Sequence, residues 1–302
     1  YSNLEEQKEV FEIRKAGLNI LMSMKGDKKP VAFIEDCAVS LDHLADYTAQ
    51  LKEIFKKYNT SGMFYAHASV GTLHIRPVLN MKSDEDIKNM RSISEESFEI
   101  VKNYKGSHSG EHGDGIVRSE FHEMMFGKKI VNAFEEIKDT FDSKNLLNPG
   151  KIVRPFKSND RDLMRYKLGY QAQNISTHYD WSNWGQFTDA VEMCNNNGAC
   201  RKLDSGVMCP SYRVTKEEKD LVRGRANTLR LALSNQLPEG SFASKEMYET
   251  MELCVSCKAC QRECPMSVDM AKMKSEFLSH YYKKFSMRIK DRITSEMPRL
   301  IW

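Results

Sequence analysis

The chain has 302 residues, of which 40% are hydrophobic and 29% charged, a composition typical of a globular protein of about two domains. Its net charge of +3 is too small to indicate a nucleic-acid partner, and no apolar run approaches the roughly 18 residues of a membrane-spanning helix. Seven of the eight cysteines lie between Cys194 and Cys264, and only Cys37 lies elsewhere. The sequence therefore divides into a cysteine-poor first half and a cysteine-rich second half.

The first half alternates strand-like and helix-like patterns. In chain order, the patterns predict a strand over 31–36, a helix after Ser40, paired strands over 63–67 and 73–78, a helix from Ser83, a glycine-rich loop over 106–115 and a helix over 129–141. This alternation predicts an α+β domain in which an antiparallel sheet carries helices on one face.

The second half lacks strand-like alternation. After residue 154 the pattern fades into a polar linker, expected over 156–185. Helices are expected, in order, over 187–193, 216–234, 244–254 and 268–290. The cysteine-rich half is therefore predicted to be an all-helical domain.

Neither end of the chain has the features of a natural terminus. The sequence begins at Tyr1 without a methionine or a signal peptide, and it ends at Trp302 within a basic helical pattern. We expect a piece of a longer polypeptide. The alternative is a small protein whose first residues have been removed.

The strongest motif is the run Cys254-x2-Cys257-x2-Cys260-x3-Cys264 followed by Pro265. This is the bacterial ferredoxin spacing, in which three thiolates reach one [4Fe–4S] cluster and the fourth cysteine binds another cluster. A disulfide framework is typical of short secreted chains rather than of this one. A structural zinc site also uses thiolates, but the spacing and the trailing proline favour an iron–sulfur cluster.

A second group of cysteines echoes the first, at Cys194, Cys200 and Cys209-Pro210. If the two groups exchange one ligand, as in two-cluster ferredoxins, Cys209 joins Cys254, Cys257 and Cys260. Cys194, Cys200 and Cys264 then remain for the other site, where Asn197 stands in the place of a middle cysteine. We expect a [3Fe–4S] cluster there, a [4Fe–4S] cluster with a non-cysteine or open position, or a labile site. Cys37 is expected to be a buried structural thiol.

The first half offers a second kind of metal site. His67 and His74 lie on the paired strands, and Glu111-His112 lies in the glycine-rich loop. If the strands form a hairpin, the two imidazoles and the carboxylate of Glu111 make a plausible zinc-type site with an open position. Because neighbouring residues tend to point apart, we assign His112 as a general base rather than as a third imidazole ligand.

Three segments of the first half resemble signatures of a known family. They are His67-Ala68-Ser69-Val70-Gly71-Thr72-Leu73-His74, Gly110-Glu111-His112-Gly113 and Leu146-Leu147-Asn148-Pro149-Gly150-Lys151-Ile152. They are similar to the C-terminal cap domain of FAD-linked oxidases, the family of D-lactate, glycolate and D-2-hydroxyglutarate dehydrogenases. The cysteine half, with Cys209-Pro210-Ser211-Tyr212-Arg213, resembles the iron–sulfur module fused to large bacterial members. Together the matches cover roughly residues 30–290.

The resemblance implies a domain plan and a set of cofactors. It implies a cap domain over 1–155, a linker over 156–185 and a ferredoxin-like helical 4Fe–4S domain over 186–302. His67, His74 and Glu111 would bind a divalent metal, and His112 would remove the substrate hydroxyl proton. Asn148 and Gly113 would lie against the flavin. Most of the FAD contacts would come from a preceding flavin domain, so we expect this chain to be inactive alone.

The expected function is oxidation of a D-2-hydroxy acid, with electrons passing from FAD through the clusters to a redox protein or a quinone. A cytoplasmic enzyme is expected, with peripheral attachment to the inner face of a membrane as an option. Two other readings remain open. One is an electron-transfer subunit whose first half docks a partner, and the other is a metal hydrolase that uses His67, His74 and Glu111.

Overall fold

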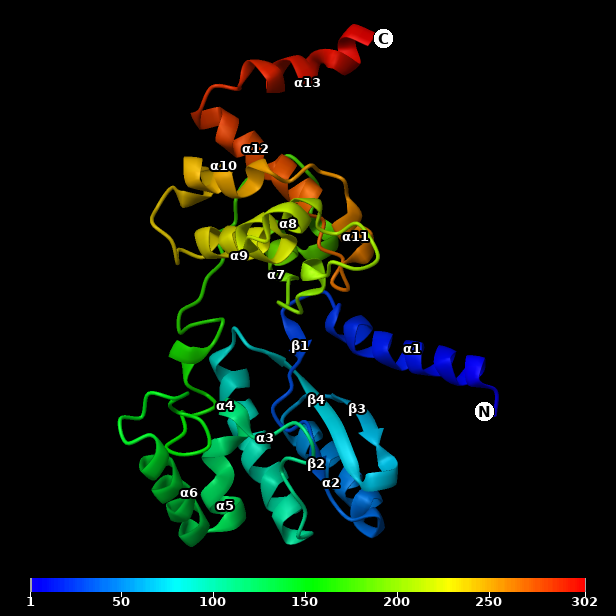
Figure 1. Ribbon diagram of the computed structural model, residues 1–302, viewed down its shortest axis with the longest axis vertical. Helices are drawn as coiled ribbons and strands as arrows, with labels where there is room; N and C mark the ends of the chain where they lie inside the picture. The colour runs from blue at the N-terminus through cyan, green and yellow to red at the C-terminus, as the bar shows by residue number, and fades with distance from the viewer. Residues whose placement is uncertain (1, 302) are drawn as a thin grey trace. The chain divides into compact units, whose positions relative to one another are not determined.

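A computed structural model describes residues 2–301 and divides them into two compact units (Figure 1). The sheet unit comprises residues 27–170. The cysteine unit comprises residues 171–301 together with the N-terminal residues 2–26. Residues 1 and 302, at the outer limits of the two expected domains, lie outside the described part of the chain.

The sheet unit is built around one long central strand, β4 (Thr72–Asn80). The strand β3 (Gly62–His67) pairs with it antiparallel along one edge, joined through a tight turn at Ala68–Val70. The short strands β1 (Lys28–Pro30) and β2 (Cys37–Ala38) pair antiparallel with opposite ends of the other edge. The predicted antiparallel sheet is therefore confirmed.

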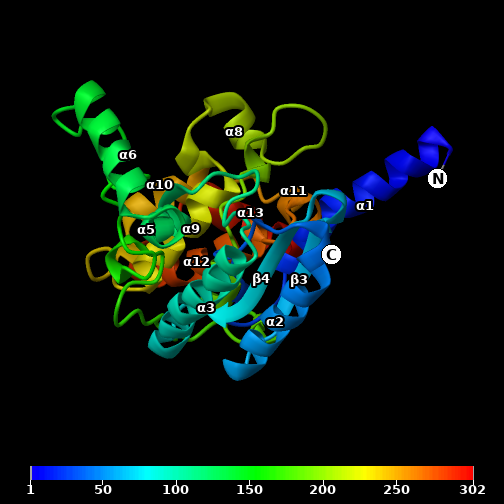
Figure 2. The same ribbon diagram turned by 90° about the horizontal axis from the view of Figure 1, so that it is seen from below.

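Two helices cover one face of this sheet (Figures 1 and 2). They are α2 (Leu44–Lys57) and α3 (Asp84–Asn103), which bury apolar residues against Leu73, Ile75 and Leu79 of β4. Successive strand residues alternate between the two faces, so His74 and Arg76 lie on the face opposite this core. The α+β arrangement with helices on one face is confirmed, and it leaves the other face for polar side chains.

The expected strand over 31–36 is wrong. The amide of Val31 donates to Pro77 O and that of Asp36 to Leu73 O, but the residues between them bend away from β4. Phe33 and Ile34 turn into the core in this bend, and Asp36 takes a left-handed conformation (φ +82°). Core packing of two adjacent apolar side chains breaks the strand alternation here.

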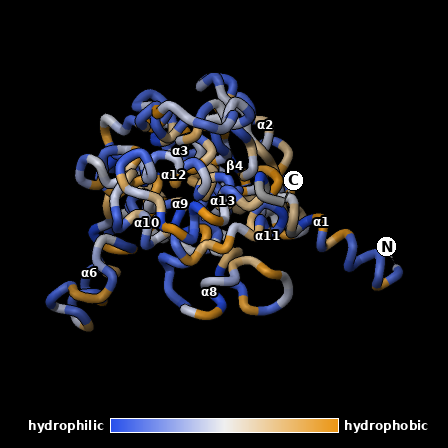
Figure 3. The backbone as a smooth tube through the Cα atoms, turned by 90° about the horizontal axis from the view of Figure 1, so that it is seen from above, coloured by the Kyte–Doolittle hydropathy of each residue, from blue (hydrophilic) through white to orange (hydrophobic). Residues whose placement is uncertain are grey.

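The remaining helices of the sheet unit are α4 (Gly115–Arg118), α5 (His122–Phe126) and α6 (Lys128–Phe141). Ser83 caps α3 through the amide of Asp86, as its sequence position predicts. Ser40 makes no such bond, because a 3₁₀ turn over Leu41–His43 precedes α2. Hydrophilic and hydrophobic residues alternate along α6, none of whose described residues is buried (Figure 3).

Among its described residues, the cysteine unit consists of helices and connecting loops and contains no strand. Its helices, in chain order, are α1 (Leu4–Met22), α7 (Phe187–Glu192), α8 (Pro210–Thr215), α9 (Val222–Leu233), α10 (Lys245–Glu252), α11 (Ala259–Glu263), α12 (Met270–Lys284) and α13 (Ile289–Ile301). The core gathers residues from α7, α9, α10 and α12, and it includes four buried cysteines at Cys194, Cys200, Cys209 and Cys260. The all-helical prediction is confirmed. Within residues 2–301, none of the helices combines the length and apolarity needed to cross a bilayer.

Two of the expected helices are interrupted. The segment 216–234 begins as a turn, because Lys216 closes α8 in a left-handed conformation and a 3₁₀ turn over Glu218–Asp220 precedes α9. The segment 268–290 breaks after α12, where Phe285 is extended. Local backbone geometry ends both helices without a proline or glycine to signal it.

Candidate active site and cysteine clusters

His67 and His74 face the same side of the β3–β4 hairpin. The register places Tyr65 opposite His74, and His67 follows Tyr65 by two residues, so all three share one face. The ring centroids of His67 and His74 lie 5.1 Å apart. Gly71 permits the turn between them, since its φ is +71° and a Cβ there would lie 1.9 Å from Val39 O. The hairpin expected from the sequence thus brings the two imidazoles together.

The carboxylate of Glu111 joins these two imidazoles and a third. One oxygen, Oε1, lies 3.1 Å from His74 Nε2, 3.3 Å from His67 Nε2 and 3.3 Å from His112 Nε2. The His112 ring stacks on His74 at 5.0 Å. His74 is buried, whereas the side chains of the other three are between 38% and 45% exposed. The four groups therefore meet at a point that solvent and a small molecule can reach.

The expectation that Glu111 and His112 point apart is wrong. Both belong to an irregular loop rather than to a strand, and the carboxylate of the buried Asp36 accepts hydrogen bonds from both of their amides at 2.7–3.0 Å. Burial alone would raise the pKa of Asp36, but the amides of His112 and Glu111 hold that pKa below its ordinary value. Asp36 therefore acts as an ionised anchor that turns both side chains toward one place.

Glu35, the residue before this anchor, orients His112. Its Oε1 lies 3.3 Å from His112 Nδ1, while its Oε2 forms an ion pair with Arg76 at 2.5 Å. A carboxylate at Nδ1 favours the tautomer in which Nε2 carries the lone pair. Sequence reasoning missed Glu35 and Asp36. The only signal was an acidic pair directly after the apolar run 31–34.

The two residues expected near the flavin lie on exposed backbone. Gly113 has φ +79°, and a Cβ built on it would meet nothing within 4 Å. Asn148 is exposed in a left-handed conformation (φ +51°), beside the exposed side chains of Leu146 and Leu147. Asp142 shapes this loop by accepting hydrogen bonds from the amides of both leucines.

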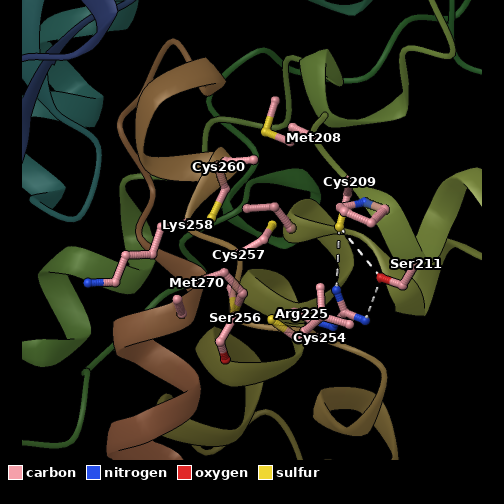
Figure 4. Close-up of a pocket in the computed structure, with 15 residues that line it drawn as sticks. Met208, Cys209, Ser211, Arg225, Cys254, Ser256, Cys257, Lys258, Cys260 and Met270 are labelled. Atoms are coloured by element: carbon pink, nitrogen blue, oxygen red, sulfur yellow. Dashed lines mark hydrogen bonds between the residues drawn. The ribbon is translucent and has the colours of Figure 1, made fainter. Parts of the chain in front are cut away.

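Four cysteines line one cavity of the cysteine unit. They are Cys209 from the start of α8, Cys254 and Cys257 from the loop after α10, and Cys260 from α11 (Figure 4). Ser256 and Lys258 take left-handed conformations, which curl the loop around the cavity. The structure thus brings together the same four thiols that the spacing grouped. In the absence of metal, burial raises the pKa of Cys260 to about 11.

Two basic side chains contact residues that line this cavity. The guanidinium of Arg225 is fully buried, donates to Cys209 Sγ at 3.7 Å and to Ser211 Oγ at 3.1 Å, and lies near Asp220 (Figure 4). Lys274 Nζ donates to the carbonyl of Cys254 at 2.5 Å, and burial lowers the pKa of this amine. Positive charge at this position would stabilise thiolates and an electron-rich group.

Three further cysteines form a second group. Burial raises the pKa of Cys200 to about 11, and the thiols of Cys194 and Cys264 raise it further. The side chain of Asn197 donates from Nδ2 to Asn195 Oδ1, and its Oδ1 accepts from the backbone amide of Ala199. Its polar atoms are therefore used within its own loop. The amide oxygen near the thiols is that of Asn196, 3.8 Å from Cys194 Sγ.

Cys37 stands apart from both groups. It is fully buried in the core of the sheet unit, with its sulfur near Ile34 O, and its pKa is raised to about 12 by burial. The thiol is therefore protonated and packed among apolar side chains, the form of a structural cysteine.

Curated proteins similar to this chain include dehydrogenases and an oxidase subunit. The D-2-hydroxyglutarate dehydrogenase of Pantoea ananatis is 30% identical over 97% of this chain and 32% of its own length, and that of Haemophilus influenzae is 30% identical over 98% and 32%. The glycolate oxidase subunit GlcD of Bacillus subtilis is 29% identical over 49% of this chain and 31% of its own length. The chain thus spans about a third of the length of these relatives.

Two protein families match successive parts of the chain. Residues 190–268 match the 4Fe-4S dicluster domain, which contains all the clustered cysteines. Residues 1–152 match the C-terminal domain of FAD linked oxidases, the part that contains His67, His74, Glu111 and His112. The chain therefore belongs to the family of FAD linked oxidases, and in it the C-terminal domain of that family is followed by a 4Fe-4S dicluster domain.

Proposed function

We propose that this chain supplies the substrate-oxidising site and the electron relay of an FAD-dependent dehydrogenase acting on a D-2-hydroxy acid. The observation that carries the proposal is the convergence of three imidazole nitrogens on Glu111 Oε1 at 3.1–3.3 Å. The family and the named relatives support the reaction class.

His67, His74 and Glu111 would hold a divalent metal ion of the zinc class. Two imidazoles and a carboxylate are ligands that zinc prefers, and the exposure of His67 and Glu111 leaves a position open for substrate. Burial lowers the pKa of His74, which keeps its imidazole neutral, as a ligand must be. A metal ion bound there would polarise the substrate hydroxyl and lower its pKa.

His112 would act as the general base. Glu35 at Nδ1 leaves Nε2 as the basic nitrogen, and Nε2 faces the place where the hydroxyl would be held. Removal of the hydroxyl proton by His112 would accompany departure of a hydride from the carbon that bears the hydroxyl, and the product would be the 2-oxo acid. Gly113 and Asn148 would be the contacts from this chain to a bound FAD, which would supply the hydride acceptor.

The cysteine unit would carry the electrons onward. Cys209, Cys254, Cys257 and Cys260 fit a [4Fe–4S] cluster, because all four residues line one cavity. Cys194, Cys200 and Cys264 would hold a second cluster, either [3Fe–4S] or a [4Fe–4S] whose remaining iron lacks a thiolate. The final acceptor would be a redox protein or a quinone.

D-2-hydroxyglutarate is the first substrate to test, since the relatives that align over nearly the whole chain carry that name. In the FAD-loaded enzyme that contains this chain, His112→Ala should slow substrate-driven flavin reduction by about 10²–10⁴-fold. The variant should retain its FAD and its zinc-class metal. Flavin reduction at the normal rate would refute the base assignment.

The metal content of the same variant distinguishes the two roles that His112 could take. If His112→Ala loses the metal together with activity, His112 is a ligand and not the base. A protein that contains iron but no other metal, even with all histidines intact, would favour an electron-transfer subunit in which this site binds no substrate.

A further inference from the structure

A second cluster of histidine and carboxylate groups lies in the sheet unit, apart from Glu111. Asp114 Oδ1 lies 3.3 Å from His108 Nε2, and Asp114 Oδ2 lies 3.1 Å from His122 Nε2. His108 is completely buried and His122 is 2% exposed. One ligand atom from each residue lies within 4.8 Å of the others. The proposed reaction uses none of these three side chains.

The tautomer of His122 makes this arrangement unusual. Its Nδ1 lies 3.1 Å from the carbonyl oxygen of Ile152, which can only accept a hydrogen bond, so Nδ1 carries the proton. In the neutral ring Nε2 then has a lone pair and no hydrogen. The facing atom, Asp114 Oδ2, belongs to a carboxyl group of a type that is ionised near neutral pH. Two acceptors 3.1 Å apart repel each other unless a cation lies between them.

His108 faces the same carboxylate without a hydrogen bond. Neither ring nitrogen of His108, nor Asp114 Oδ1, nor His122 Nε2 has a hydrogen-bond partner. A buried polar atom that lacks a hydrogen-bond partner destabilises the fold. In its neutral form His108 can bind a metal ion through Nε2, the nitrogen that faces Asp114.

Aromatic rings pack around the two histidines of this cluster. Rings of Phe98, Phe126 and Phe134 pack against the two histidines. The charged group that faces the cluster is Arg118, whose guanidinium is committed to the carbonyls of Glu35 and Gly113. The rings cover both histidines, and the Asp114 side chain, which is 22% exposed, is the part of the cluster that reaches solvent.

We propose that His108, Asp114 and His122 hold a second divalent metal ion of the zinc class. The ion binds Nε2 of both histidines and the Asp114 carboxylate. The Nδ1–H of His122 on the Ile152 carbonyl is the outer hydrogen bond that metal-binding histidines usually make. Because Asp114 follows His112 by two residues, the ion fixes one end of the loop that carries Glu111 and His112.

Metal analysis of the cluster-loaded chain tests this site. Zinc, manganese, cobalt and copper are counted per chain, with iron counted separately so that the cysteine sites do not contribute. His108→Leu and His122→Gln should each hold one equivalent less than the unmodified chain, whatever the Glu111 site binds. The control His43→Gln, at a histidine that only stacks on Tyr104, should lose none. An unchanged count in a folded His108→Leu or His122→Gln chain would overturn the proposal.

A second variant decides the question even if the buried substitutions prevent folding. His74→Ala removes a ligand of the Glu111 site and leaves His108, Asp114 and His122 intact. This chain should still hold one equivalent of the ion, and zinc added to its metal-stripped form should raise its Tm. A count of zero with no rise in Tm would overturn the proposal.

Discussion

The two units hold their reactive groups in place by different physical means. In the sheet unit, strand register and the buried carboxylate of Asp36 position the site, and the core of α2, α3 and β4 lies on the opposite face. In the cysteine unit, Cys194, Cys200, Cys209 and Cys260 belong to the hydrophobic core itself. The sheet unit should therefore fold without its metal, whereas the cysteine unit should depend on its clusters.

Removal of iron tests this difference between the two units most strongly, and it has the largest expected effect. A chelator under reducing conditions should unfold the cysteine unit, because the cysteine thiols in its core would lose the iron–sulfur clusters that they bind. Hydrogen exchange measured by mass spectrometry should then rise over α7, α9 and α12 and stay low over β4 and α3. Equal loss of protection in both units would show that their stabilities are not separate.

The anchor of the sheet unit gives the next largest effect. Asp36→Asn keeps a side chain that tolerates a positive φ but removes the charge that accepts two amide protons. Zinc affinity at the Glu111 site should fall about 10–100-fold, the usual loss for an outer partner of a metal site. Asp42→Asn, at an exposed aspartate, is the matched control. Unchanged affinity in the Asp36 variant would mean that the loop holds its shape without the anchor.

A smaller, pH-dependent effect is expected in the cysteine unit at Glu276, which is fully buried. Burial would raise the pKa of this carboxyl, but hydrogen bonds from Trp181 and from the amides of His178 and Tyr179 hold it below the ordinary value. The ionised form therefore stabilises the fold above the unfolded pKa of about 4.3, and this stability is lost as pH falls through the lower folded pKa.

The substitution Glu276→Gln should accordingly lower Tm at pH 7, with a cost of about 1–3 kcal/mol for the bonds lost. The difference from the unmodified chain should shrink as the pH falls below about 4. Glu239→Gln, at an exposed glutamate, should change Tm little at either pH. A difference between Glu276→Gln and the unmodified chain that is constant with pH would contradict the role of the charge.

The sequence predicted groups that short spacing holds together and missed groups that only the fold brings together. Two residues separate Cys254 from Cys257 and two separate Cys257 from Cys260, so few backbone paths can hold them apart. His67 and His74 follow from a tight hairpin. Asp36 and Glu111 lie 75 residues apart, and their contact depends on a bend that core packing imposes on Phe33 and Ile34. No local pattern encodes such a contact.

The same reason explains the errors in the helices. Caps at Ser83 and Ser244 have their own sequence signal, and the structure shows both. The breaks at Lys216 and Phe285 lie at residues that sit equally well inside helices, so tertiary contacts decide them. The helix α1 also went unpredicted, because its residues are mostly polar or exposed and its apolar pattern is weak.

The central claim is that the sheet unit oxidises the substrate and the cysteine unit carries its electrons. The most direct test mixes the FAD-loaded enzyme with D-2-hydroxyglutarate without oxygen and follows flavin absorbance and the cluster EPR signal in one experiment. With these roles, flavin reduction comes first, cluster reduction follows, and both are slowed together in His112→Ala. Cluster reduction at the normal rate in His112→Ala, or ahead of flavin reduction, would contradict it.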